Sequence, residues 1–180
     1  MAPKGQVLKL QLHLSDFENN HYQTHRLTLV QHPSETDRRL MFRVAVYALW
    51  AFEEPQFTKG LCVAEEPELW TLDLQGQVSH WIELGQPEPK RLGQACGKSK
   101  AVTVYSYQAN AAAWYETQAD KLRRYDKLAV YGIGEAEGGP LEKLLNEGTE
   151  FTAQIQDGSL WLSCGDAQVT LSVPCLKERG

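Results

Sequence analysis

The chain opens with a regular alternation of apolar and polar residues. From Val7 to Leu14 every second side chain is apolar, the period of a β-strand with one buried face. The segment Ser15–His21 is polar and typical of a turn, and the alternation resumes over Tyr22–Val30. Two alternating segments joined by a short polar one predict an N-terminal β-hairpin.

A helix is predicted after this hairpin. Pro33 interrupts the strand pattern, Ser34 is a suitable N-cap, and Asp37 three residues later completes an acidic capping box. The apolar residues that follow recur on one helical face, and Pro55 marks the end. They are Leu40, Met41, Val44, Ala45, Ala48, Leu49 and Phe52. This pattern places Glu35 in the first helical turn.

The rest of the chain alternates between strand and helix patterns. The expected strands are Phe57–Val63, Leu69–Leu74, Val78–Leu84, Lys100–Tyr107 and Leu128–Ile133. The expected helices are Pro87–Lys98, Ala109–Tyr125 and, after a glycine-rich loop at Glu135–Pro140, a short one at Pro140–Asn146. The tail alternates over Phe151–Gln156, Ser159–Ser163 and Val169–Val173, with Asp-Gly and Gly-Asp turns between. We therefore expect an α/β fold with a mixed sheet and a C-terminal antiparallel meander.

Composition favours one soluble domain over residues 1–180. The chain has 180 residues, 42% of them hydrophobic, which is enough for one sizeable core. Its longest apolar run, Val44–Phe52, is about half a membrane span, and Met1–Gly5 lack a secretory signal. Four scattered cysteines, Cys62, Cys96, Cys164 and Cys175, are typical of reduced thiols. These features predict a cytoplasmic protein.

Acidic side chains gather in the middle of the chain. Glu66 and Glu68 lie in one turn, and Glu83 lies near the end of an apolar strand, where a carboxylate needs a partner or a metal ion. Hard cations such as Mg²⁺ or Mn²⁺ prefer oxygen ligands, and one or two carboxylates plus substrate phosphates suffice to bind them. The sequence therefore predicts a divalent metal site at Glu68 and Glu83, with Glu35 and Glu66 as further ligands.

Several short motifs resemble the YaeQ family. They run across nearly the whole chain at similar spacings. They are His32-Pro33-Ser34-Glu35-Thr36 with Arg39, Phe57-Thr58-Lys59-Gly60-Leu61-Cys62, Glu66-Pro67-Glu68 with Trp70, Trp81-Ile82-Glu83-Leu84-Gly85 with Pro87, and Ile155-Gln156-Asp157-Gly158. The resemblance implies a variant of the PD-(D/E)xK nuclease fold, whose core has the order helix, three strands, helix.

Carried over by position, the resemblance assigns the two parts of the nuclease motif. Pro67-Glu68 corresponds to PD, and Glu83-Leu84-Gly85 to (D/E)xK. The lysine of that motif is replaced by Gly85, and the neighbouring helix has Gln94 where relatives often carry a lysine. The basic residues left nearby are Lys90, Arg91 and Lys98, of which Arg91 best resembles the family pattern.

Two functions follow from this resemblance. In the first, a metal-dependent phosphodiesterase, Glu68 and Glu83 hold Mg²⁺ or Mn²⁺, Gln86 positions a water, and Arg91 or Lys98 neutralises the phosphorane. In the second, loss of the lysine leaves a non-catalytic binding or regulatory module with the same fold. The sequence names no substrate, no preference between DNA and RNA, and no oligomeric state.

Structural explanations stand beside these functional ones. The helix dipole alone favours an acid at Glu35, and the acids from Glu65 to Glu68 are also typical of a solvated turn. The net charge of -5 disfavours nucleic acid unless a local basic patch attracts it. The dense basic cluster is Lys121, Arg123, Arg124 and Lys127. It is either a solvated helix end or the patch that guides a nucleic acid.

Overall fold

A computed structural model describes residues 5–59 and 64–180 of the chain. The chain forms a mixed α+β fold with two six-stranded sheets, both containing parallel and antiparallel pairs. The described residues divide into two compact units. Unit 1 comprises residues up to Glu53 and Glu135–Ser172, and unit 2 comprises Glu54–Gly134 and Val173–Gly180. The prediction of a single domain over residues 1–180 stays a prediction.

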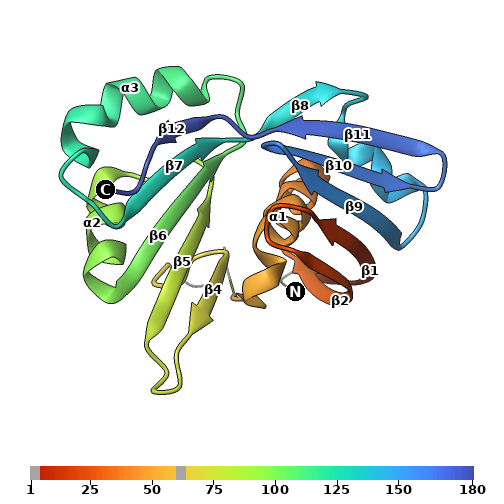
Figure 1. The fold of residues 1–180 in the computed structure, drawn as a ribbon, viewed down its shortest axis with the longest axis horizontal. Helices are drawn as coiled ribbons and strands as arrows, with labels where there is room; N and C mark the ends of the chain where they lie inside the picture. Colours follow the sequence, from red (N-terminus) through yellow and green to blue (C-terminus); the bar gives the residue numbers. More distant parts are fainter. Residues whose placement is uncertain (1–4, 60–63) are drawn as a thin grey trace. The chain divides into compact units, whose positions relative to one another are not determined.

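The sheet of unit 1 has the order β2-β1-β9-β10-β11-β8 (Figure 1). Its strands are β1 (Gln6–Asp16), β2 (His21–Gln31), β8 (Gly134–Glu137), β9 (Glu150–Gln156), β10 (Ser159–Cys164) and β11 (Ala167–Ser172). The predicted hairpin and meander are confirmed, because in each strand every second side chain is buried and fixes the register. The two are joined by parallel pairing of β1 with β9. The predicted loop at Glu135–Pro140 is partly wrong, since its first residues form β8.

Unit 1 also contains the helix α1 (Asp37–Trp50), followed by a 3-10 turn η1 (Ala51–Glu53). The helix is confirmed, but its predicted N-cap is wrong. Thr36 caps it, and its hydroxyl accepts a hydrogen bond from the Arg39 amide at 3.1 Å. Ser34 instead bonds to the His32 ring. Glu35 therefore precedes the N-cap rather than lying in the first turn. A 3-10 helix, η3 (Leu141–Asn146), contacts α1.

The sheet of unit 2 has the order β12-β7-β6-β5-β4-β3 (Figure 1). Its strands are β3 (Gln56–Phe57), β4 (Leu69–Leu72), β5 (Val78–Leu84), β6 (Ser99–Ser106), β7 (Leu128–Gly132) and β12 (Cys175–Lys177). The predicted strand at Phe57–Val63 is confirmed at Phe57 and wrong at Thr58 and Lys59, which follow the end of β3; residues 60–63 lie outside the described part. Strands β5, β6 and β7 run parallel, and β4 pairs antiparallel with β5.

Two helices, α2 (Pro89–Lys98) and α3 (Ala111–Leu122), cover one face of this sheet. Leu92, Ala95 and Leu122 from the helices share a buried core with strand residues that include Trp81. Because α2 connects the parallel strands β5 and β6, it lies directly over the end of β5. This connection brings α2 beside the predicted site residue Glu83. None of the described helices has the length and apolar character needed to cross a bilayer.

Candidate functional site

The carboxylate of Glu83 lies on the helix-covered face of the unit 2 sheet. Residues two apart on a strand point to the same face, and Trp81 belongs to the core beneath α2 and α3. The Trp81 indole donates a hydrogen bond to Glu83 Oε1 at 2.9 Å. Only 8% of the Glu83 side chain is exposed. The prediction that this carboxylate needs a partner is therefore confirmed, and its strand neighbour supplies one.

The main partner of Glu83 is Arg91, from the first turns of α2. The Arg91 Nε donates to Glu83 Oε1 at 2.8 Å, and the guanidinium lies 5.8 Å from the centre of the Trp81 ring. Its terminal nitrogens donate to the backbone carbonyls of Ala64 and Glu66, the latter at 2.9 Å. One arginine thus joins strand β5, helix α2 and the acidic turn before β4.

The acidic turn contributes its backbone and side chains to this arrangement. Glu68 precedes β4, and its amide donates to the carbonyl of Ile82 at 3.1 Å, which brings the Glu68 backbone beside the part of β5 that carries Glu83. The Glu68 residue is buried, with 8% exposure. The Glu66 carboxylate accepts the Lys59 amide at 3.1 Å. The turn is therefore built into unit 2 rather than fully solvated.

The other predicted catalytic residues lie near opposite ends of α2, since Gln86 precedes the helix and Lys98 is its last residue. The Gln86 amide donates to Asn110 Oδ1 at 2.8 Å and to Ser106 Oγ at 3.2 Å. Its amide group thus links the end of β5 to the segment before α3. Lys98 in the last turn of α2 lines a cleft of about 260 Å³ together with Lys90 and Arg91. Lys90 was not among the predicted site residues, although Lys90, Gln94 and Lys98 recur at helical i, i+4, i+8 spacing.

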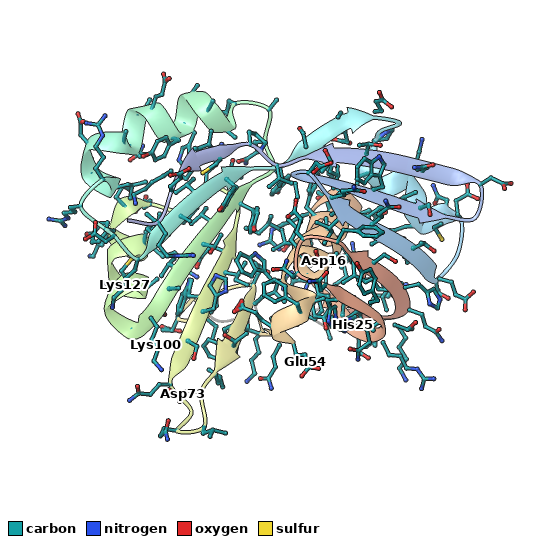
Figure 2. The ribbon with its side chains drawn as sticks, in the orientation of Figure 1. Asp16, His25, Glu54, Asp73, Lys100 and Lys127 are labelled. Atoms are coloured by element: carbon teal, nitrogen blue, oxygen red, sulfur yellow. The ribbon has the colours of Figure 1, made fainter. Side chains whose placement is uncertain are left out.

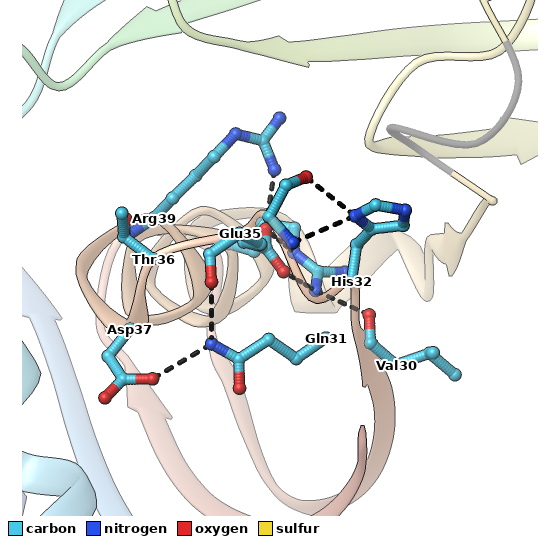
Figure 3. Close-up of polar contacts among 9 residues, drawn as sticks. Val30, Gln31, His32, Glu35, Thr36, Asp37 and Arg39 are labelled. Carbon is cyan, nitrogen blue, oxygen red and sulfur yellow. Dashed lines mark hydrogen bonds and ion pairs between the residues drawn. The ribbon is translucent and has the colours of Figure 1, made fainter. Parts of the chain in front are cut away.

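Glu35, the fourth predicted metal ligand, belongs to unit 1 and is held there by arginines (Figure 3). Its Oε1 accepts Arg43 at 2.6 Å, and its Oε2 accepts Arg39 at 2.6 Å and Arg43 at 3.0 Å. The Glu35 side chain is 1% exposed and that of Arg43 is 7% exposed. This charge-assisted network fixes the segment between β2 and α1.

One of the two carboxylate oxygens of Glu83 is already occupied in this arrangement. Arg91 and the Trp81 indole already occupy Oε1, and a second cation at the same oxygen would be repelled by the guanidinium. In the described ranges 5–59 and 64–180, no three His, Cys, Asp or Glu side chains gather closely enough to hold an ion. The predicted sharing of an ion by Glu68 and Glu83 stays a prediction.

The four residues of the predicted basic cluster differ in their surroundings. Lys121 and Arg124 line a cleft between α2 and α3. Arg123 pairs with Asp120 at 3.3 Å on the exposed face of α3. Lys127, labelled in Figure 2, donates to the backbone carbonyls of Cys96 and Ser99 beyond the end of α2. Two of the four cations therefore face the cleft, where Lys90 joins them.

Comparison with known proteins relates the whole arrangement to one family. A family model described as "YaeQ protein" matches residues 1–173. The chain is 33% identical to the uncharacterized protein YaeQ of Salmonella typhi over 96% of this chain and 95% of that protein. It is also 33% identical to the uncharacterized protein YaeQ of Escherichia coli K12, over 91% of each chain.

Two crystal structures share the fold. The YaeQ protein from Xanthomonas axonopodis pv. citri superposes with a TM-score of 0.88 at 34% identity, over 97% of this chain and 99% of that one. The YaeQ protein from Pseudomonas syringae gives a TM-score of 0.83 at 24% identity, over 98% of both chains. The resemblance suggested by the motifs is therefore confirmed, and the chain belongs to the YaeQ family.

Proposed function

We propose that this protein is a non-catalytic nucleic-acid-binding module of the cytoplasm, built on a PD-(D/E)xK-like core. The order α1, β3, β4, β5, α2, β6 supports the core assignment, because it matches the helix, three strands and helix implied by the motifs. The observation that carries the proposal is the ion pair between Arg91 and Glu83. It neutralises the carboxylate of the (D/E)xK motif and ties it to the fold.

The backbone at Gly85 supports the loss of catalysis. This residue stands where the motif has its lysine, and its φ of +116° lies in a region that side-chain-bearing residues rarely adopt. The Gly85 amide is also fixed by a hydrogen bond to the Tyr105 carbonyl at 2.8 Å. A lysine at this position would be strained, and the positive charge nearest to Glu83 is instead that of Arg91 from α2.

The cations around α2 and α3 support nucleic acid as the ligand. The clefts beside these helices are lined by five cations and three acidic residues, whereas the whole chain carries a net charge of -5. The cations are Lys90, Arg91, Lys98, Lys121 and Arg124, and the acidic residues are Glu65, Glu88 and Asp120. Such a local concentration of positive charge attracts phosphates despite the acidic total. The described cysteines Cys96, Cys164 and Cys175 are free thiols, which agrees with a reducing compartment.

The test combines binding and cleavage. Purified protein is titrated with Mn²⁺ by calorimetry, and with labelled DNA and RNA by fluorescence anisotropy, each also with the Glu83→Gln variant. We expect nucleic-acid binding in the absence of divalent ions, no Mn²⁺ binding that depends on Glu83, and no cleavage. Failure to bind either nucleic acid would refute the proposal.

A Mg²⁺- or Mn²⁺-dependent phosphodiesterase is the second candidate. The burial of both Glu68 and Glu83 favours it, since carboxylates are costly to bury without a function or a partner. For an ion to bind at Glu83 Oε1, Arg91 has to release that oxygen. Mn²⁺ binding that disappears in Glu83→Gln, together with Mn²⁺-dependent cleavage by the wild type alone, would establish this function instead.

A further inference from the structure

The largest of three neighbouring clefts in unit 2 lies between α2 and α3. It encloses about 670 Å³, and its walls carry Lys90 from α2 and Lys121 and Arg124 from α3 and the residues after it. Asp120 is the single acidic residue on these walls. Its carboxylate pairs with Arg123 at 3.3 Å. The cleft is therefore a concave, positively charged site with a cation on each side.

Lys90 connects this cleft with the other two. A second cleft of about 490 Å³ shares Lys90 and Lys121 and adds Trp114 to its lining. The third, of about 260 Å³, shares Lys90 and adds Arg91 and Lys98. The second and third clefts also share Glu88, and the third adds Glu65. Because cations still outnumber acidic residues along this chain of clefts, it offers successive positions to a ligand with regularly spaced negative charges.

The cations differ in how they are held. In the part of the chain that the structure describes, neither Lys90 nor Lys121 forms an ion pair, so their ammonium groups are available to a phosphate. Arg124 is ordered, because it donates to the Tyr125 hydroxyl at 2.7 Å and its guanidinium lies 4.8 Å from the centre of that ring. Tyr125 in turn lies against α2, where an added Cβ at Gly93 would come within 2.5 Å of its hydroxyl. The Arg124 guanidinium thus covers the Tyr125 ring at the cleft.

We infer that this cleft binds single-stranded nucleic acid, with phosphates at Lys90 and Lys121 and an unpaired base stacked on the Arg124 guanidinium that covers Tyr125. The inference rests on the proposed function and adds the location and the form of the ligand. A flat surface with exposed cations would bind a duplex as well as a single strand. A recess between two helices, with cations on both walls and a guanidinium held on an aromatic ring, adds a stacking surface that only an unpaired base can use.

The experiment measures anisotropy of a labelled single strand of about 12 nucleotides, as DNA and as RNA, against the matching duplex. Loss of one phosphate contact lowers the slope of log K against log salt by about 0.7 and weakens binding about fivefold at 0.1 M salt. We expect this effect for Lys90→Gln and for Lys121→Gln, and a larger loss for the variant with both changes. Lys100→Gln is the matched control, since Lys100 lies in the same unit but pairs with Asp73 away from the clefts (Figure 2).

The outcomes distinguish failure of this inference from failure of the proposed function. Binding that is tighter for the single strand and weakened by both cleft variants, but not by Lys100→Gln, supports the inference. Binding that is unchanged in the cleft variants, or equally tight for the duplex, overturns it and leaves the proposed function intact. Equal binding of poly-glutamate also overturns it, because the cleft would then recognise charge alone. Absence of any nucleic-acid binding by the wild type removes the proposed function as well.

Discussion

Among single residues, Glu35 depends on two arginines that contribute unequally. Arg43 contacts both carboxylate oxygens and is 7% exposed, whereas Arg39 contacts one oxygen and is 14% exposed. Removing one partner of a buried pair leaves an uncompensated charge. We therefore expect Arg43→Met to lower the free energy of unfolding by about 3 kcal/mol, as measured by urea denaturation.

Arg39→Met is the matched comparison for that change. It removes the same charge from the same helix but leaves the two-oxygen contact of Arg43 with Glu35. The expected loss is about 1 kcal/mol, the range of a partly exposed ion pair. Equal losses in the two variants would contradict the unequal roles assigned to the arginines.

The Arg91–Glu83 pair is the second prediction at this scale. The two side chains are 32% and 8% exposed, so solvent screens the pair only in part. A double-mutant cycle of Glu83→Gln and Arg91→Gln should give a coupling energy within the range of about 0.5 to 3 kcal/mol found for residues in contact. A coupling energy of zero would mean that Arg91 acts only through Trp81 and the turn carbonyls.

The sequence predicted the need of Glu83 for a partner better than it predicted which partner it has. Glu83 was expected to need a partner because an apolar strand surrounds it, and it has one. Nothing in the spacing distinguished a metal ion from Arg91, since both satisfy a buried carboxylate. The N-cap was assigned to Ser34 rather than Thr36 for a similar reason. Both have a hydroxyl near the helix start, and the interaction with His32 that occupies Ser34 is not visible in a helix pattern.

At the scale of elements, helix α2 contains two glycines, of which one has space for a side chain and the other does not. A Cβ at Gly97 would meet nothing within 4 Å, whereas one at Gly93 would come 2.5 Å from the Tyr125 hydroxyl. Alanine favours a helix over glycine by about 1 kcal/mol. We therefore expect Gly97→Ala to raise the thermal midpoint, and Gly93→Ala to lower it despite the same gain in propensity.

Tyr125→Phe tests the cause of the difference. Without the hydroxyl, the shortest contact of the new Cβ disappears, so Gly93→Ala should destabilise less in the Tyr125→Phe background than in the wild type. If the two penalties are the same, the close approach between α2 and Tyr125 is not what excludes alanine at position 93.

Strands were predictable from the sequence where one face is buried and the other exposed. They were missed where only backbone hydrogen bonding to a neighbouring strand defines them. The strands of the hairpin and the meander alternate clearly, because their other faces are exposed. Strand β8 contains Gly134-Glu135-Ala136-Glu137, residues with low strand propensity, and forms at the edge of the sheet beside β11. Strand β12 is also short, with three residues, and follows Pro174. Neither has a periodic pattern that a sequence could reveal.

For the whole molecule, stability in acid depends on carboxylates that are held charged. The Arg38 guanidinium donates two hydrogen bonds to Glu135, at 2.6 and 2.7 Å, and lowers the pKa of that carboxyl from 4.5 to about 2. The same contact raises the pKa of Arg38. Because the folded-state pKa of Glu135 lies below the unfolded value, its contribution to stability is complete above pH 4.5 and is lost as the pH falls toward 2.

Glu135→Gln should therefore change the slope of the free energy of unfolding against pH, and not only its value at one pH. Between pH 4.5 and 2 the Glu135 carboxyl of the wild type takes up a proton when the protein unfolds, and glutamine cannot. The free energy of unfolding should therefore fall less steeply with falling pH in the variant than in the wild type. Glu137→Gln, two residues further along β8 and exposed, is the control and should keep the wild-type slope. Parallel slopes for Glu135→Gln and the wild type would show that other carboxylates govern acid unfolding. A slope reduced in Glu135→Gln alone would assign that part of the acid sensitivity to the pair between α1 and β8.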